Sequence, residues 1–231
     1  MSLFAIGDTH LSFGTDKPMN VFRGWDNYVE RLESNWKRVV KQDDTVVIMG
    51  DVSWSMNLDG AYEDFRFLNS LPGEKIILKG NHDYWWNTKK KTDEFFKQNS
   101  FETLNILFNN SYRVGDISVC GTRGWFFDAE NDADLKIVNR EAGRLRASIA
   151  EGKKLGGEPV VFLHYPPINS EHKCEPILNV LIEEGITRCY YAHLHSASAA
   201  FSFNGTAYGI KFELMSADWL GFCPKAVQMI K

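Results

Sequence analysis

The sequence predicts an α/β fold of two packed sheets flanked by helices. Over the first hundred residues, short apolar runs alternate with helical patterns, an order typical of parallel strands joined by right-handed crossover helices. The second half carries more short apolar runs separated by turn residues, which indicate a second sheet. Because no repeat, low-complexity tract or linker interrupts the 231 residues, we expect one domain over residues 1–231.

In the first half, apolar runs predict the strands, and apolar residues at three- and four-residue spacing predict the helices. The helix that begins at Tyr28 shows this spacing most clearly, since its apolar positions recur from Val29 to Val40. The next helix ends before Pro72-Gly73, because proline cannot continue it. The predicted elements are a strand at Leu3–Gly7, a helix at Tyr28–Lys41, a strand at Thr45–Gly50, a helix at Leu58–Leu71, a strand at Lys75–Gly80 and a helix at Thr88–Gln98.

The second half is predicted to hold short strands on either side of one long charged helix, Asp134–Lys154. Asn204-Gly205 suits a type I′ turn, so we expect a hairpin there. The runs after the helix resume the buried-strand pattern of the first half. The predicted strands lie at Ile106–Phe108, Tyr112–Val114, Ile117–Gly121, Val160–Leu163, Arg188–Ala192, Ala207–Leu214 and Ala226–Ile230.

Composition argues against several partners and locations. The net charge of −4 gives no overall attraction to nucleic-acid phosphates or anionic membranes, so nucleic acid is not the expected partner. The four cysteines are widely spaced and form no C-x-x-C pair, as expected of reduced thiols in a cytosolic protein. Asp8 interrupts the first apolar run, which argues against a signal peptide, and no apolar segment approaches the roughly 20 residues of a membrane span. We therefore expect a cytoplasmic protein.

Histidine, aspartate and asparagine residues gather where the predicted strands end. These residues are Asp8, His10, Asp51, Asn81, His82, His164, His193 and His195. The members of the pairs Asp8/His10 and His193/His195 are two apart, so in extended backbone both members point to the same side. Asp51 and Asn81 each follow a glycine, which permits a sharp turn or a close backbone approach. In open α/β sheets, ligands bind beyond the carboxyl ends of the strands, where all these residues fall.

The candidate ligands are imidazoles and oxygen donors without thiolates. This set suits Mn²⁺, Fe or Zn²⁺ better than Ca²⁺, and the lack of cysteine ligands argues against a structural zinc site. Two such cations, about 3.5–4 Å apart, need a bridging carboxylate and can share a hydroxide. The sequence therefore predicts a site for two divalent metal ions, with Mn²⁺ as the first expectation and Fe or Zn²⁺ as alternatives.

Five ordered motifs relate these residues to a known family. They are Asp8-x-His10, Gly50-Asp51, Gly80-Asn81-His82-Asp83, His164 and His193-x-His195, and they span residues 8–195. The series resembles the calcineurin-like metallophosphoesterase superfamily, except that the last motif opens with Ala192 where the family has glycine. The strings Leu11-Ser12-Phe13-Gly14 and Lys17-Pro18-Met19 look like a bacterial branch of predicted phosphohydrolases without established substrates. The resemblance implies the metallo-dependent phosphatase fold, a four-layer α/β/β/α sandwich.

The resemblance also implies roles for individual residues. One cation would be held by Asp8, His10, Asp51 and His195, and the other by Asp51, Asn81, His164 and His193. Asp51 would bridge the two cations and so take part in catalysis. His82 would face the leaving-group oxygen as a general acid or stabilise the phosphoryl charge. The implied enzyme is a metal-dependent phosphoesterase that cleaves a mono- or diester of a small phosphorylated substrate by in-line attack of a metal-bridging hydroxide.

Two branches of the superfamily are disfavoured by the residues that follow Asp51. Ser/Thr protein phosphatases carry an acidic residue three positions after this aspartate and then an arginine, whereas this chain has Trp54 and Ser55. Purple acid phosphatases have a metal-ligating tyrosine at the position of Trp54, and an indole cannot replace it.

Several residues beside the motifs are further candidates, each with two interpretations. Arg123 could clamp a phosphate oxygen bidentately or form an exposed salt bridge. His172 lies in a polar loop and could contact the substrate or only solvent. Asp83 could be catalytic, or it could cap the next helix or form a turn. The loop Leu11–Asp26 is long enough to be a lid or a pocket wall.

Two alternative functions stay open at this level. A nuclease of the same superfamily would need a basic track for the nucleic-acid backbone, which this acidic chain does not show. A non-catalytic scaffold protein would bind metals only for folding or for binding a partner. Such a protein is expected to have lost some of the metal ligands, whereas this chain keeps every motif residue. The substrate, the preference for mono- or diesters, the native metal and the oligomeric state do not follow from the sequence.

Overall fold

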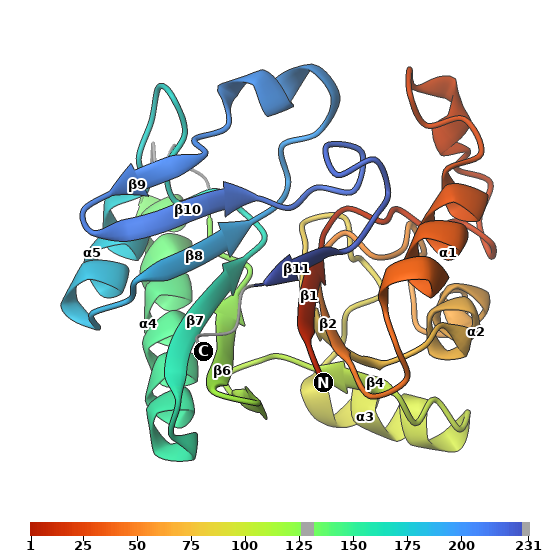
Figure 1. Cartoon of the computed structure of the whole chain (residues 1–231), viewed down its shortest axis with the longest axis horizontal. Coiled ribbons are helices and arrows are strands. Elements are labelled where there is room, and N and C mark those ends of the chain that lie inside the picture. The colour runs from red at the N-terminus through yellow and green to blue at the C-terminus, as the bar shows by residue number, and fades with distance from the viewer. Residues whose placement is uncertain (126–131, 228–231) are drawn as a thin grey trace.

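Two mixed sheets pack face to face, with helices on both outer faces (Figure 1). The computed structural model describes residues 1–125 and 132–227. The helices over the first sheet are α1 (Tyr28–Val39), α2 (Tyr62–Ser70) and α3 (Lys89–Gln98), and those over the second are α4 (Asp132–Leu155) and α5 (Glu175–Glu183). The predicted α/β class and the four-layer order implied by the resemblance are both confirmed.

The first sheet has the strand order β11-β1-β2-β3-β4. Its strands are β1 (Leu3–Ile6), β2 (Thr45–Met49), β3 (Glu74–Leu78), β4 (Leu104–Ile106) and β11 (Lys225–Val227). The first four are mutually parallel, and β11 runs antiparallel to β1. The alternation of strands and helices in the sequence therefore gave the right sheet, and its parallel strands all end at the same edge.

Local hydrogen bonds explain two shifted boundaries in this half. β4 lies two residues before the predicted Ile106–Phe108, because Asn110 Oδ1 accepts the N–H of Phe108 at 2.6 Å and turns the chain. Helix α2 begins four residues after the predicted Leu58, since the preceding turn is closed by the N–H of Gly60 on Asn57 Oδ1 at 2.8 Å.

The second sheet has the strand order β5-β6-β7-β8-β10-β9. Its strands are β5 (Tyr112–Val114), β6 (Ile117–Thr122), β7 (Glu158–Leu163), β8 (Arg188–Tyr191), β9 (Gly205–Ala207) and β10 (Ile210–Leu214). The four inner strands are parallel, whereas β5 and β9 pair antiparallel at the edges. This sheet therefore also directs its inner carboxyl ends to one edge.

The predicted turn at Asn204-Gly205 is wrong. The hairpin turns at Tyr208-Gly209, whose φ angles of 54° and 75° suit a type I′ turn. Asn204 instead accepts the N–H of Leu214 through its side chain at 2.9 Å, and Gly205 begins β9. The predicted strand Ala207–Leu214 is accordingly divided by that turn.

Most other strand bounds differ from the prediction by one or two residues, and further differences concern the helices and the chain end. Helix α5 was not among the predicted elements, and α4 extends beyond the predicted Asp134–Lys154 at both ends. Short 3₁₀ helices η1 (Met19–Val21) and η2 (Ser196–Phe201) lie in the loops after β1 and β8. The end of the predicted strand Ala226–Ile230 lies outside the described residues. Within the described ranges, no helix combines the length and apolar character needed to cross a bilayer.

Alternation along the strands builds the apolar layers. In β2, Val46 and Ile48 pack against the helices, while Val47 and Met49 face the second sheet, as the period of two requires. Phe162 of β7 belongs to the same layer between the sheets. Burial on both faces fixes the strand register, so the strand ends are held rigidly where the polar motifs begin.

Candidate metal centre

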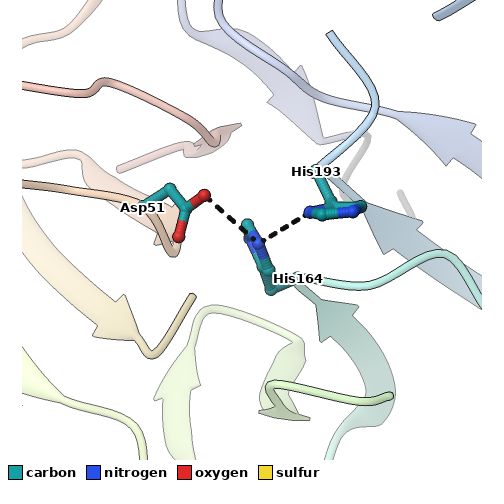
Figure 2. Close-up of side chains that lie close together, drawn as sticks. All are labelled: Asp51, His164 and His193. Atoms are coloured by element: carbon teal, nitrogen blue, oxygen red, sulfur yellow. Dashed lines mark hydrogen bonds and ion pairs between the residues drawn. The ribbon is translucent and has the colours of Figure 1, made fainter. Parts of the chain in front are cut away.

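The predicted site residues follow strands of both sheets. Asp8, Asp51 and Asn81 follow β1, β2 and β3, and His164 and His193 follow β7 and β8. Figure 2 shows Asp51, His164 and His193 pointing toward one another, from loops that belong to the two sheets. Residues far apart in the chain therefore meet at one edge of the sandwich.

One group of candidate ligands consists of Asp51, His164 and His193, whose ligand atoms all lie within 4.8 Å of one another. His164 Nε2 is 3.5 Å from Asp51 Oδ2 and 3.3 Å from His193 Nδ1. The side-chain oxygen of Asn81 lies 2.7 Å from the same His164 nitrogen. These are the four side chains that the resemblance assigns to one cation.

A second group contains Asp8, His10 and, again, Asp51, also within 4.8 Å. His10 Nε2 is 3.8 Å from Asp51 Oδ2. The ring of His195 stands edge-on to the ring of His10, with 5.3 Å between centroids. Five of the seven predicted ligands thus form two adjoining groups that share Asp51, and Asn81 and His195 lie beside them. These seven residues are the candidate metal site and are called the metal centre below.

Several buried atoms of the metal centre have no hydrogen-bond partner among the described residues. They are Asp8 Oδ1, Asp51 Oδ2 and both ring nitrogens of His10. Burying polar or charged groups without a partner is costly, and a bound cation is one of the few things that offsets that cost. The carboxylate and imidazole donors also match the preferences of Mn²⁺, Fe and Zn²⁺. The residues therefore fit divalent cations.

Burial raises the pKa values of the carboxyl groups and lowers those of the histidines in the metal centre. Burial and then the nearby charge of Asp51 raise the pKa of Asp8, and burial raises the pKa of Asp51 to about 6. Burial lowers the pKa of His164 to about 3, and burial together with neighbouring histidines lowers the pKa of His193. Near neutral pH these histidines are neutral, with lone pairs available to a metal, while the carboxylates need a nearby positive charge.

The backbone around the metal centre adopts conformations that most residues avoid. Asp8, His10, Asp51 and His193 all have positive φ, between 45° and 72°. Such strain in non-glycine residues concentrates at functional sites. Gly80 is required for a different reason, because a Cβ there would lie 2.1 Å from Asp51 Oδ1. The glycine of this motif thus lets two loops approach each other, as the sequence indicated.

The sequence profile of the calcineurin-like phosphoesterases matches residues 1–197. The chain belongs to this family. No curated protein matches the chain in sequence. Among solved structures, a protein of unknown function from Aquifex aeolicus is 18% identical, with a TM-score of 0.54, over 97% of this chain and 95% of that one. A phosphopantetheinyl hydrolase from Mycobacterium tuberculosis is 14% identical, with a TM-score of 0.55, over 99% of this chain and 96% of that one.

Asp83, the last residue of the G-N-H-D motif in this calcineurin-like phosphoesterase, joins two site loops. Its buried carboxylate accepts the N–H groups of Gly80, Asp51 and Val52 at 2.7, 2.9 and 2.8 Å, and the indole N–H of Trp85 at 2.8 Å. It does not cap the next helix, since Thr88 is the N-cap of α3. Asp83 therefore fixes the backbone on which Asp51 and Asn81 stand.

His82 lies beside the metal centre but in neither ligand group. Its backbone N–H donates to Asp51 Oδ1 at 2.8 Å, and its ring packs on the indole of Trp54, with 4.5 Å between centroids. Trp54 also stacks on His10 at 4.8 Å. The indole of Trp54 thus orients two histidines of the site.

Two aromatic neighbours of the metal centre were not predicted. Trp25, in the Leu11–Asp26 loop, lies 5.8 Å from His10, and Met19 of the same loop accepts the indole N–H of Trp54 at 3.3 Å. That loop is therefore a packed wall of the site.

The ring of Tyr165 is the second such neighbour, with 4.5 Å between its centroid and that of the His193 ring. Its position directly after His164 was a usable signal, whereas nothing in the sequence marked Trp25.

The family's glycine before the last motif is Ala192 here, and the structure accommodates its methyl group. Ala192 is fully buried and packs against Gly7, where an added Cβ would lie 2.4 Å from the Cβ of Ala192. The methyl group of Ala192 thus occupies the space that a side chain at Gly7, at the end of the neighbouring strand β1, would need.

The two candidate substrate contacts have different surroundings. Arg123 is mostly buried, lies 3.9 Å from Glu141 and stacks over Trp125 at 4.7 Å, and its positive charge helps lower the pKa of Asp51 against the larger effect of burial. His172 is 59% exposed and lies 3.8 Å from Glu171, so it is not gathered with the metal centre. Substrate contact by either residue stays a prediction.

Proposed function

We propose that this protein hydrolyses a mono- or diester of a small phosphorylated molecule by in-line attack of hydroxide on phosphorus. The observation that carries the proposal is the single buried carboxylate of Asp51, which belongs to two adjoining ligand groups. Membership of the calcineurin-like phosphoesterases and the similar fold of a phosphopantetheinyl hydrolase support the same reaction class.

Asp8, His10, Asp51 and His195 would hold one divalent cation, and Asp51, Asn81, His164 and His193 would hold the other. When bound, such a pair lowers the pKa of the attacking water and neutralises charge on the phosphoryl oxygens. His82 supplies the proton to the leaving-group oxygen, because its ring lies beside the metal centre without belonging to it. The hydrogen bond from its backbone to Asp51 holds that ring in place.

We expect Mn²⁺ to activate the protein and to stabilise it. Purified protein with Mn²⁺ should cleave nitrophenyl phosphate mono- or diesters, and a chelator should abolish the activity. Saturating Mn²⁺ to about 100 times its Kd would add about 2.7 kcal/mol per site, or a rise in Tm of roughly 5–10 °C. Parallel assays with Fe²⁺, Zn²⁺ and Mg²⁺ rank the metals. Stabilisation by metal without turnover of any ester would overturn the hydrolase in favour of the scaffold.

Replacing His82 by alanine should slow hydrolysis in a manner that depends on the leaving group. Positioned general acids contribute about 10²–10⁴-fold. The loss should be at least about 100-fold on an alkyl phosphate, which needs a proton, and much smaller on nitrophenyl phosphate, whose leaving group does not. The rise in Tm with Mn²⁺ should persist in this variant. Equal losses on both substrates would assign His82 to charge stabilisation instead.

A further inference from the structure

A basic pocket of about 260 Å³ lies next to the metal centre. Four cationic side chains line it, Lys79, Arg123, Arg140 and Arg144, together with one carboxylate, Glu141. Lys79 lies two residues before Asn81 of the metal centre. None of these four cationic side chains is among the predicted metal ligands, and of the four only Arg123 was predicted to contact a substrate.

The pocket adjoins the metal centre through the ends of β6 and β7. Thr122, at the end of β6, pairs with Leu163, the residue before His164. The next residues are joined as well, since the N–H of Tyr165 donates to the carbonyl of Arg123 at 2.9 Å. The pocket and the metal centre therefore stand on adjoining loops at the ends of β6 and β7.

The buried carboxylate of Glu141 organises the pocket. It accepts the hydroxyl of Thr122 at 2.6 Å and an N–H of Arg144 at 2.5 Å, and Arg123 lies 3.9 Å away. The guanidinium of Arg144 also rests over the ring of Phe108, at 4.9 Å from its centroid. Both arginines are thus held in place before any ligand arrives, which lowers the entropic cost of binding one.

The pocket has more positive charge and more donors than its own residues use. Among the described residues that line the pocket, one carboxylate faces four cationic side chains, and each arginine offers five N–H donors. The Nε of Arg123 is buried and has no hydrogen-bond partner within the part of the chain that the structure describes. A group that satisfies these donors must be strongly anionic and rich in acceptor oxygens.

We propose that this pocket binds a second phosphate group of the substrate, so that the protein acts on small phosphate esters that carry two phosphates. The inference rests on the proposed function, since it takes the first phosphate to be the one that reacts at the metal centre. A phosphate carries a charge near −2 at neutral pH and presents three acceptor oxygens, which matches the excess of cations and the paired N–H donors of arginine.

Bisphosphates of unbranched diols, from ethanediol to hexanediol, test the proposal, each compared with the monophosphate of the same diol. At least one spacer should give a kcat/KM at least about tenfold above that of its monophosphate, as expected for one added charge-assisted contact. Arg144→Gln and Arg123→Gln should each reduce that ratio at least about fivefold. The matched control is Arg146→Gln. Arg146 lies on α4, as Arg144 does, but its side chain is exposed and pairs with Glu183. An unchanged ratio in both pocket variants, or no advantage at any spacer, would overturn the proposal.

Two further measurements keep the proposal testable on its own. Arg144→Gln removes a partner of buried Glu141, so Arg140→Gln, at an exposed position, serves as a second variant and should lower the ratio in the same direction. Titration of metal-free protein with inorganic phosphate should show binding that weakens in both variants. If phosphate binds in this way but no ester is hydrolysed, the pocket stands and the hydrolase proposal fails. Stronger competition by a short oligonucleotide than by any bisphosphate would overturn the assignment to small molecules.

Discussion

Asp51→Asn is expected to reduce hydrolysis at least about a thousandfold, a loss of roughly 4 kcal/mol of transition-state stabilisation. Asparagine keeps the shape of the side chain and one acceptor oxygen for the N–H of His82, but it removes the charge of the one carboxylate shared by the two ligand groups. Neither cation could then be held as in the unaltered protein. The kcat/KM with Mn²⁺ and the rise in Tm on adding Mn²⁺ are measured together, and both should fall.

Asp44→Asn is the matched control. Asp44 is also buried, lies just before β2, and accepts the backbone N–H groups of Ser2 and Lys41 at 2.6 and 2.8 Å. Its substitution should lower the free energy of unfolding while leaving the response to Mn²⁺ intact. Activity of the Asp51 variant within tenfold of the unaltered protein would contradict the role of Asp51 as the shared ligand.

Asp51→Asn should also remove a pH effect on the stability of the metal-free protein. Burial raises the pKa of Asp51 from its ordinary 3.8 to about 6, so the folded chain holds this proton over a range where the unfolded chain has lost it. Asp51 therefore contributes a loss of stability as the pH rises from about 4 to about 6, and this penalty persists above that range. Asp51→Asn should flatten this part of the profile in thermal unfolding with chelator present.

The sequence was sufficient to predict that the candidate ligands lie together, because each motif is local. Asp8 and His10, or His193 and His195, are close in the chain, and the parallel strands before them necessarily end at a common edge. Contacts between residues far apart in the chain could not be predicted from the sequence. Arg123, directly after β6, lies beside Glu141 of α4, which also pairs with Arg144. No local sequence pattern predicts that one buried carboxylate pairs with two arginines.

The misplaced hairpin has a similar physical origin. Asn-Gly is a good type I′ sequence wherever it stands, but the two possible turns compete for the same strands. The side chain of Asn204 gains a hydrogen bond to the N–H of Leu214, and Tyr208-Gly209 then takes the turn. Tertiary hydrogen bonding overrode a local preference, which a reading of single residues does not reveal.

Asp83→Ala is expected to be the most destabilising single change near the site. It leaves five buried N–H donors without this acceptor, the longest of these hydrogen bonds being the 3.4 Å one from Ser53, and each such group costs about 1–3 kcal/mol. Removing a buried carboxylate, whose pKa is raised to about 7 by burial and by Asp51, offsets part of this cost. We expect a net loss of at least about 3 kcal/mol, or a fall in Tm of roughly 6–12 °C.

The activity of the Asp83 variants shows whether Asp83 positions the candidate metal ligands or only stabilises the fold. Since Asp83 holds the N–H groups of Asp51 and Gly80, its loss should raise the Mn²⁺ concentration for half-maximal activity even at temperatures where the variant is fully folded. Asp83→Asn keeps one acceptor oxygen and should be intermediate in both Tm and metal requirement. Trp85→Phe removes only the indole donor, so it should lower Tm with an unchanged metal requirement. If all three variants lost stability but bound Mn²⁺ equally well, Asp83 would support the fold without positioning the ligands.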